Sequence, residues 1–389
     1  MRIVVFCHSL VSDWNHGNAH FLRGVCAELL DRGHDVRVFE PLDGWSRAHL
    51  VAGHGREAVD AVFDAFGWMH RPVSNVYDPR DLDISASPGG RDEIDAMTAG
   101  ADLVLVHEWN DPALVALLGR HKAAGGYRLL FHDTHHRAVT KPAEMSRYDL
   151  QHYDGVLAFG GVIRELYLER GWAARAWTWH EAADVRTFHP IDGVARRGDL
   201  VWVGNWGDGE RTAELHEFLI DPVRRLGLRA HAYGVRYPAA AQESLAAAGI
   251  RYGGWRPSHR VAAAFAAHGV TVHVPRRPYV EALPGIPTIR PFEAMACGIP
   301  LVCAPWEDSE RLFSAGKDFL VARNGAEMER HLDDVLHDPG LARALRDHGL
   351  QTIHERHTCG HRVDELIAIC AELGLAATAP TEPEGPSHG

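Results

Sequence analysis

Continuous apolar runs alternate with amphipathic segments through the first 180 residues. Residues 2–7 (RIVVFC) form an uninterrupted apolar run, which is typical of a strand buried on both faces of a parallel sheet. Residues 18–33 repeat apolar side chains at helical spacing. The same reasoning predicts strands at 34–40, 101–109, 127–133 and 154–160, helices at 56–69, 111–121 and 162–170, and a loop at 71–91. This alternation predicts a doubly wound α/β domain.

The pattern then stops and starts again. Residues 182–199 have no clear period and are predicted to link two domains. Beyond them we predict strands at 199–206, 228–234, 269–275 and 300–305, and helices at 211–226, 240–248, 258–268 and 338–373. The sequence therefore predicts two α/β domains, residues 1–182 and 183–373, followed by a disordered Pro- and Gly-rich tail at 374–389.

The composition limits the kinds of partner that the protein is expected to bind. The net charge of −12, with histidine neutral, argues against bulk attraction to nucleic acid or to an anionic membrane surface. The six cysteines show no C-x-x-C spacing and several sit in apolar runs, so we predict a reduced, cytoplasmic protein. No apolar stretch reaches the length of a membrane span, and no integral membrane association is expected. Whether the protein forms a homo-oligomer stays open.

One short segment places a charged pair at the start of a helix built mostly of small residues. Residues 289–300 read IRPFEAMACGIP, in which Pro291 suits the first helical position and Glu293 then falls in the first turn. Gly298 and Pro300 end the helix, and the following PLVCAP predicts a buried strand. From local spacing alone, Glu293 stabilises the helix dipole with Arg290 as its partner. The helix N-terminus is predicted to face a ligand.

The layout and the segment PTIRPFEAMACGIPLV together resemble the GT-B glycosyltransferases of the retaining, family-4 type, and most nearly their spore-maturation-related subgroup. The resemblance is strong over roughly 200–370 and weaker over 1–180. It implies two Rossmann-like domains facing each other across a cleft. The C-terminal domain would hold a nucleotide-diphosphate sugar, and the N-terminal domain most of the acceptor.

The resemblance assigns donor-binding roles to the helix of this segment. Glu293 would accept hydrogen bonds from ribose hydroxyls, because a carboxylate offers only acceptors. Thr288 and the backbone near Ile289 would face the diphosphate. For Arg290, phosphate binding and positioning of Glu293 stay open. The family pattern has a second glutamate eight residues earlier, where this chain has Gly285, so sugar recognition by that glutamate is not carried over.

Other donor contacts are predicted from loops that follow strands. In VGNWGDGER (203–211), Gly204 and Asn205 allow close backbone approach, and Arg211 would neutralise phosphate as the leaving group departs; an ordinary strand-to-helix turn is the alternative. The resemblance implies that Gly17 and Asn18 approach the donor phosphates at a helix start, which is compatible with a plain N-cap by Asn18. Trp255 lies where the family contacts the nucleobase, and a core or interface aromatic is an equal alternative.

The candidate catalytic residues end a strand of the first domain. His132, in FHDTHHR (131–137), matches the family's histidine near the anomeric carbon, and Asp133 would orient it or receive the acceptor's proton. Zinc is the competing interpretation of this histidine cluster. It is disfavoured because His135 and His136 are adjacent and no second cluster has zinc spacing. No metal and no obligatory cofactor is predicted.

The sequence thus predicts sugar transfer from a nucleotide-diphosphate sugar to a soluble small-molecule acceptor, with retention implied by the resemblance. Two other classes stay open. One is a nucleotide-sugar epimerase or hydrolase on the same fold, against which Gly285 argues mildly. The other is a non-catalytic nucleotide-sugar-binding subunit, because fold does not imply function.

Overall fold

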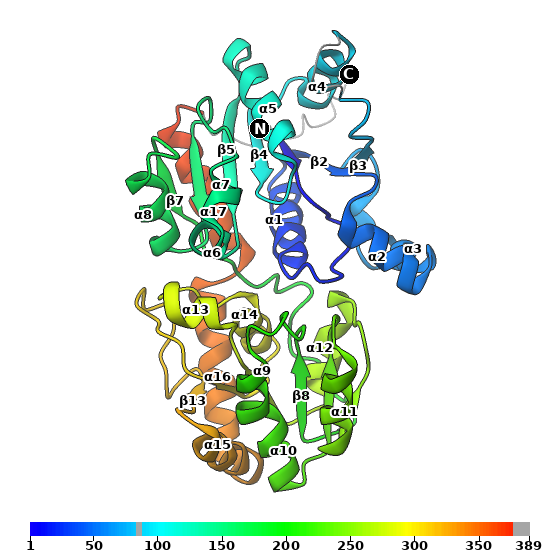
Figure 1. The fold of residues 1–389 in the computed structure, drawn as a ribbon, viewed down its shortest axis with the longest axis vertical. Helices are drawn as coiled ribbons and strands as arrows, with labels where there is room; N and C mark the ends of the chain where they lie inside the picture. Colours follow the sequence, from blue (N-terminus) through cyan, green and yellow to red (C-terminus); the bar gives the residue numbers. More distant parts are fainter. Residues whose placement is uncertain (83–87, 376–389) are drawn as a thin grey trace, which may run out of the picture.

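A computed structural model of the chain describes residues 1–82 and 88–375, with side chains for all of these except 88–92. Two lobes lie one above the other, each built on its own parallel sheet with helices on both faces (Figure 1). The predicted doubly wound α/β architecture is confirmed in both halves of the chain. The predicted disordered tail falls, from residue 376 onward, outside the described residues.

The N-terminal sheet has seven strands in the order β3-β2-β1-β4-β5-β6-β7. Strand β1 is central, with Ile3 opposite Val36 on one side and Leu103 on the other. The strands are β1 (Arg2–Phe6), β2 (Asp35–Pro41), β3 (Ser74–Tyr77), β4 (Leu103–His107), β5 (Arg128–Asp133), β6 (Gly155–Ala158) and β7 (Ala176–Thr178). The strand order reverses between β1 and β4, so the loops after these strands open a crevice at that point.

Helices on the N-terminal sheet follow the strands in βαβ order. They are α1 (Ala19–Asp31), α2 (Trp45–His54), α3 (Glu57–Ala65), η1 (Gly67–Met69), α4 (Pro88–Thr98), α5 (Pro112–Ala124), α6 (Arg137–Thr140), α7 (Pro142–Met145) and α8 (Gly161–Glu169). The predicted loop at 71–91 was wrong in part, because it contains β3 and the start of α4. Four residues of edge strand are too few for a periodic signal.

The C-terminal sheet has six strands in the order β10-β9-β8-β11-β12-β13, again all parallel. They are β8 (Leu200–Val203), β9 (Ala230–Tyr233), β10 (Ile250–Tyr252), β11 (Val270–His273), β12 (Leu301–Cys303) and β13 (Leu320–Val321). The helical elements are α9 (Thr212–Leu215), η2 (His216–Ile220), α10 (Asp221–Leu226), α11 (Ala239–Ala247), η3 (Ser258–Arg260), α12 (Val261–Ala266), α13 (Arg277–Ala282), α14 (Ile289–Ala296), α15 (Gly325–His337) and α16 (Pro339–Arg356). The order reverses between β8 and β11, which places a second crevice there.

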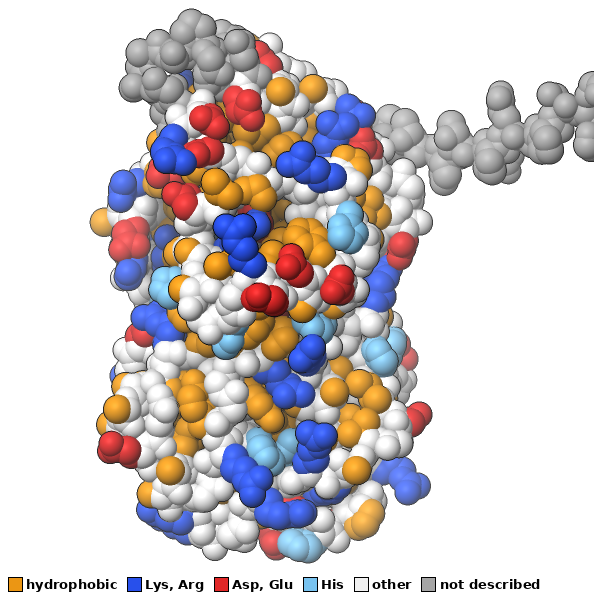
Figure 2. Space-filling view, turned by 90° about the vertical axis from the view of Figure 1, so that its right-hand side faces the viewer, with side chains coloured by type: hydrophobic (Ala, Val, Ile, Leu, Met, Phe, Trp, Pro, Cys, Tyr) orange, Lys and Arg blue, Asp and Glu red, His pale blue; other side chains and the backbone are white. Residues whose placement is uncertain are grey.

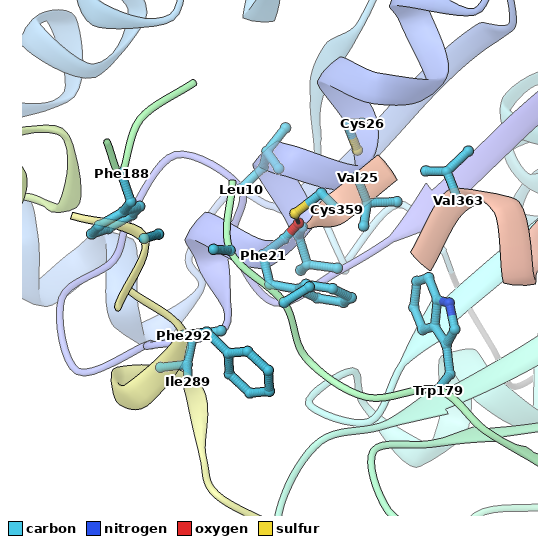
Figure 3. Packing of buried hydrophobic residues seen from close by; sticks show 14 of the residues in the cluster. Leu10, Phe21, Val25, Cys26, Trp179, Phe188, Ile289, Phe292, Cys359 and Val363 are labelled. Carbon is cyan, nitrogen blue, oxygen red and sulfur yellow. Dashed lines mark hydrogen bonds between the residues drawn. The ribbon is translucent and has the colours of Figure 1, made fainter. Parts of the chain in front are cut away.

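The last helix, α17 (Cys359–Glu372), returns to the N-terminal lobe and packs on α1 (Figures 1 and 3). A Cβ on Gly24 would lie 2.5 Å from the Cys359 sulfur, so the glycine lets the two helices approach closely. Trp179 Nε1 donates to the carbonyl of Arg362 at 2.8 Å. The predicted helix at 338–373 is therefore two helices, α16 and α17. The second of them packs on the N-terminal lobe and not on the C-terminal lobe. The limits 1–182 and 183–373 stay a proposal about folding units.

The surface shown in Figure 2 carries Lys and Arg side chains gathered over the C-terminal lobe, although the whole chain is acidic. All six cysteines are buried and unpaired. Within residues 1–82 and 88–375, no helix is both long and apolar enough to cross a membrane.

Trp179→Ala should lower the free energy of unfolding by about 3 to 5 kcal/mol, the usual cost of emptying a buried tryptophan site. Trp179 is 1% exposed and packs its ring against Phe21 of α1. Chemical denaturation measures the loss. Trp172→Ala is the control, because Trp172 is only partly buried and packs against Tyr167 of α8 within the N-terminal lobe. Equal losses in the two variants would contradict the view that Trp179 joins α17 to the N-terminal lobe.

Candidate functional site

The two crevices face each other and form one cleft of about 680 Å³. Its walls come from loops at the carboxyl ends of strands in both sheets, where open α/β sheets bind ligands. Eight of the twelve residues predicted from the sequence line it: Gly17, Asn18, Gly204, Asn205, Arg211, Thr288, Ile289 and Arg290. His132, Asp133, Trp255 and Glu293 do not.

Arg211 is a buried cation held by neutral groups. Its Nη1 donates to the carbonyl of Val274 at 2.7 Å, and its Nη2 donates to the carbonyl of Asn205. The guanidinium lies 5.1 Å from the centre of the Trp202 ring. No carboxylate of the described residues lies within ion-pairing distance of Arg211, and its Nε has no hydrogen-bond partner among them. Its position is fixed while its charge remains uncompensated.

Two further arginines share this wall. Arg276 lies 3.5 Å from Glu210 Oε2, and Arg290 pairs with Glu293. Burial, with the charge of Arg276 next in size, lowers the pKa of Arg211 to about 9. Burial also lowers the pKa of Arg290 to about 10. Both remain charged at neutral pH, and an anion in the cleft would relieve their mutual repulsion.

The loop after β8 brings Gly204 close to its own strand. A Cβ on Gly204 would lie 2.6 Å from the Trp202 ring, so a larger residue would displace the ring beneath Arg211. Asn205 contacts both lobes: its Oδ1 accepts from the Val235 amide, and its Nδ2 donates to Asn15 Oδ1 at 2.6 Å. This loop therefore contacts the N-terminal lobe and also lines the cleft. Its predicted close approach to a donor stays a prediction.

The N-terminus of α14 also faces the cleft. Thr288, its N-cap, has φ +58°, a backbone region that favours glycine and strains a β-branched residue. Its Oγ1 lies 3.3 Å from His273 Nε2. Ile289 packs against Gly17 of the N-terminal lobe. Backbone strain of this kind occurs at ligand sites, where the surrounding structure holds the residue in place.

Glu293 lies behind the cleft wall, with only 2% of its surface exposed. Its Oε1 is 2.7 Å from Nδ1 of His20, which belongs to α1 of the other lobe. Its Oε2 faces Arg290. Burial, followed by the charges of nearby arginines, holds the pKa of His20 well below its usual range, so the imidazole is neutral. Glu293 thus joins the two lobes and fixes Arg290, and its predicted ribose contact stays a prediction.

The N-terminal lobe contributes Gly17 and Asn18 through the loop before α1. Asn18 occupies the N-cap position of α1 but makes no side-chain capping bond. Instead its Nδ2 donates to Glu181 Oε1 at 2.9 Å. Asn18 is therefore the N-cap residue of α1 by position, but without a capping hydrogen bond, because its side chain is directed toward the segment that connects the lobes.

His132 and Asp133 lie beneath the cleft. His132 is 3% exposed and packs its ring against His107 and Trp179, and burial lowers its pKa to about 3. Asp133 is fully buried and accepts from the Tyr167 hydroxyl at 2.8 Å and the His135 amide at 3.0 Å. Neither side chain reaches the cleft wall, so their predicted catalytic roles stay predictions.

Trp255 is an interface aromatic between the lobes. Its Nε1 donates to Asp13 Oδ1 at 3.0 Å, and its ring lies 4.7 Å from that of His54. It does not line the cleft. The structure thus favours the interface alternative, while a nucleobase contact stays a prediction.

Several cleft residues were not predicted from the sequence. They include a carboxyl in the lobe connection, buried histidines and two aromatic side chains: Glu181, His16, His136, Trp14 and Trp45. The segment HDTHHR signalled His136, but nothing in WHEAAD marked Glu181. Among the described residues, no group of three or more His, Cys, Asp or Glu side chains is placed to hold a metal ion.

Comparisons with known proteins agree with this geometry. Residues 211–368 match a family model described as glycosyl transferase-like. Sucrose-phosphate synthase from Thermosynechococcus elongatus superposes with a TM-score of 0.67 at 14% identity, over 97% of this chain and 100% of that one. HepE from Anabaena, in complex with UDP and glucose, gives 0.67 at 14% identity, over 96% and 100%. An alpha-glucosyltransferase in complex with UDP and DNA gives 0.67 at 11% identity, over 95% and 99%.

The fold is that of the GT-B glycosyltransferases. No curated protein sequence matches the chain. The GT-B fold predicted from the sequence is confirmed across both lobes. The C-terminal GT-B lobe contains most of the segment that matches the glycosyl transferase-like family, and it supplies Arg211, Arg276 and Arg290 to the cleft.

Glu293→Ala should weaken binding of a nucleoside diphosphate and also destabilise the fold. From the sequence, which places Glu293 in the first turn, the predicted loss is about 1 kcal/mol or less. That placement is wrong, because α14 begins at Ile289 and Glu293 lies beyond its first turn. The structure predicts about 3 kcal/mol or more, because removing one partner of a buried pair leaves Arg290 and His20 unmatched. Calorimetric titration with UDP, together with chemical denaturation, measures both effects.

Glu165→Ala is the control, since Glu165 is an exposed carboxylate of α8 whose partner Arg164 also lies outside the cleft. An unchanged UDP affinity in a folded Glu293→Ala variant would remove Glu293 from the donor site, both as a ribose ligand and as the support of Arg290.

Proposed function

We propose that this protein is a glycosyltransferase that moves a sugar from a nucleotide-diphosphate sugar, most simply a UDP-sugar, to an acceptor held mainly by the N-terminal lobe. The observation that carries the proposal is Arg211, a buried cation fixed by two backbone carbonyls with no carboxylate of the described residues to neutralise it. A diphosphate supplies the missing negative charge.

The arrangement suits departure of a diphosphate without an obligatory metal. Arg211, Arg276 and Arg290 line one wall, and the N-terminus of α14 adds its dipole and free amides. Cations set in place before the reaction stabilise charge that develops on the leaving group. The donor sugar would lie toward the N-terminal lobe, where His16 and His136 line the cleft.

UDP is the nucleotide that the similar folds favour. HepE was solved with UDP-glucose and with UDP, and the alpha-glucosyltransferase with UDP. At 11 to 14% identity these proteins support a fold and a donor class, not a particular sugar. Retention of the anomeric configuration, and kinship with the spore-maturation subgroup, rest on the sequence resemblance.

A soluble small molecule is the proposed acceptor. The net charge of −12 disfavours nucleic acid and anionic lipid surfaces. The alpha-glucosyltransferase in complex with DNA is similar in fold alone. The acceptor side of the cleft presents Trp14, Trp45 and Trp109, whose faces suit a compact ring better than a long polyanion.

Incubation with labelled UDP-sugars, with and without a panel of small acceptors, distinguishes the classes. Acceptor-dependent release of UDP supports the transferase. Sugar product without an acceptor supports the epimerase or hydrolase, and binding without turnover supports a non-catalytic subunit. Either of the last two results, obtained across the panel, would overturn the proposal.

Arg211→Ala should lower kcat by about 100-fold, with a smaller rise in KM, because the charge it meets grows as the diphosphate departs. Steady-state kinetics with varied donor separates the two parameters. Arg276→Ala is the comparison, since Arg276 is only partly buried and already lies near Glu210, and its loss should be smaller. A rise in KM at constant kcat in Arg211→Ala would show that Arg211 only binds the ground state.

His132→Ala should sharply reduce transfer while leaving UDP binding intact, if the family's histidine role applies to this chain. His132→Phe fills the same buried space without ring nitrogens, so it separates chemistry from packing. Both variants should fail in turnover assays, and a chelator should not affect the wild type. Because burial keeps His132 neutral above about pH 4, as its pKa of about 3 implies, an acidic limb in the pH–rate profile would belong to another group. Restored turnover in His132→Phe would assign the residue to packing alone.

A further inference from the structure

The segment that connects the two lobes places one carboxyl in the cleft. Glu181 follows β7, lines the cleft and is 7% exposed. Its Oε1 accepts from Asn18 Nδ2 at 2.9 Å, and its Oε2 makes no hydrogen bond within the described part of the chain. The other cleft carboxylates of the C-terminal lobe have cations near them: Glu210 lies near Arg276, and Asp208 pairs with Arg236. Glu181 has no such ion pair among the described residues.

We propose that Glu181 binds the donor as a neutral carboxylic acid, with Oε1 accepting from Asn18 and Oε2 donating a hydrogen bond to a diphosphate oxygen. This inference rests on the proposed function, because it requires a nucleoside diphosphate in the cleft. A carboxylate beside a diphosphate would repel it, whereas a carboxylic acid adds a donor where backbone amides and arginines already point.

The surroundings of Glu181 favour its protonated form. Burial raises the pKa of Glu181 to about 7, and it outweighs the opposing effects of the Asn18 hydrogen bond and the Arg290 charge. The charged and titratable groups around it come from three other elements: Arg290 on α14, Glu108 after β4 and Tyr279 on α13. Of these groups only Arg290 is positively charged, and a bound diphosphate would interact with that same guanidinium. Binding therefore raises the pKa of Glu181 further, and the protein takes up a proton.

The sign of the pH dependence follows. Below about pH 7 Glu181 is already protonated, and diphosphate binding gains its hydrogen bond without proton uptake. Above that pH each binding event must also protonate Glu181, so the affinity falls by up to about tenfold per pH unit. Glu181→Gln carries a neutral amide with donors of its own, so this part of the pH dependence should vanish.

Calorimetric titration tests this with the tightest-binding member of UDP, GDP, ADP and dTDP, from pH 6 to pH 9. Repeating each titration in buffers of different ionisation enthalpy counts the protons taken up. The wild type should take up close to one more proton per diphosphate above pH 7 than Glu181→Gln, which should bind about tenfold tighter than the wild type at pH 8. The nucleotide's terminal phosphate titrates equally in both proteins and cancels in the difference.

Glu210→Gln is the matched control. It also removes a cleft carboxylate, but one with a cation near it, and it should keep the wild-type proton uptake whatever its effect on affinity. Equal proton uptake and parallel pH profiles in the wild type and Glu181→Gln would overturn the inference while leaving the transferase proposal intact. Absence of proton uptake in the wild type would overturn it even if Glu181→Gln failed to fold. No binding of any diphosphate by the wild type would reject the proposed function itself, and the inference with it.

Discussion

The buried carboxylate of Glu293 is the contact on which the geometry of the cleft depends. It lies between His20 at the start of α1 and Arg290 at the start of α14, so two helix N-termini from different lobes meet over one negative charge. Positive helix ends and a guanidinium would repel each other without it. Because Glu293 is almost fully buried, its ionised form costs desolvation, which the adjacent His20 and the ion pair with Arg290 offset. What the contact provides is a fixed direction for Arg290 on the cleft wall.

The charge balance of the cleft follows from that arrangement. Glu293 compensates Arg290 from behind, but no carboxylate of the described chain compensates Arg211. Trp202 and two carbonyls hold Arg211 through weaker interactions that leave its charge available. An ionised Glu181 would offset part of the positive charge on this wall, but burial raises its pKa and so disfavours ionisation. The same wall can therefore remain positive at neutral pH even though the chain as a whole carries a net charge of −12.

The fold and the loops of the site could be predicted from the sequence because the strands are buried on both faces. Strands such as Arg2–Phe6 and Leu103–His107 are covered on both faces, so they appear as continuous apolar runs, and the loops that follow them must meet at one edge of the sheet. Short edge strands such as Leu320–Val321 give no such signal. Side-chain direction was also beyond reach. Whether Glu293 faces ribose or His20 depends on a helix more than 250 residues away in the chain, and Glu181 lines the cleft from a connecting segment that has no periodic pattern.

The contacts between lobes are of two kinds. The His20–Glu293 contact is buried, and one apolar cluster contains residues of both lobes, among them Phe21 of α1 and Phe292 of α14 (Figure 3).

The other kind is polar. Asn205 donates to Asn15, and the Asp13 carboxylate accepts from Trp255 and from the Ser258 amide. A neutral hydrogen bond contributes about 1 kcal/mol, and a hydrogen bond to a charged group about 1.5 to 3 kcal/mol. The buried contact at the start of α14, rather than these polar contacts, therefore fixes the arginine that it holds on the cleft wall.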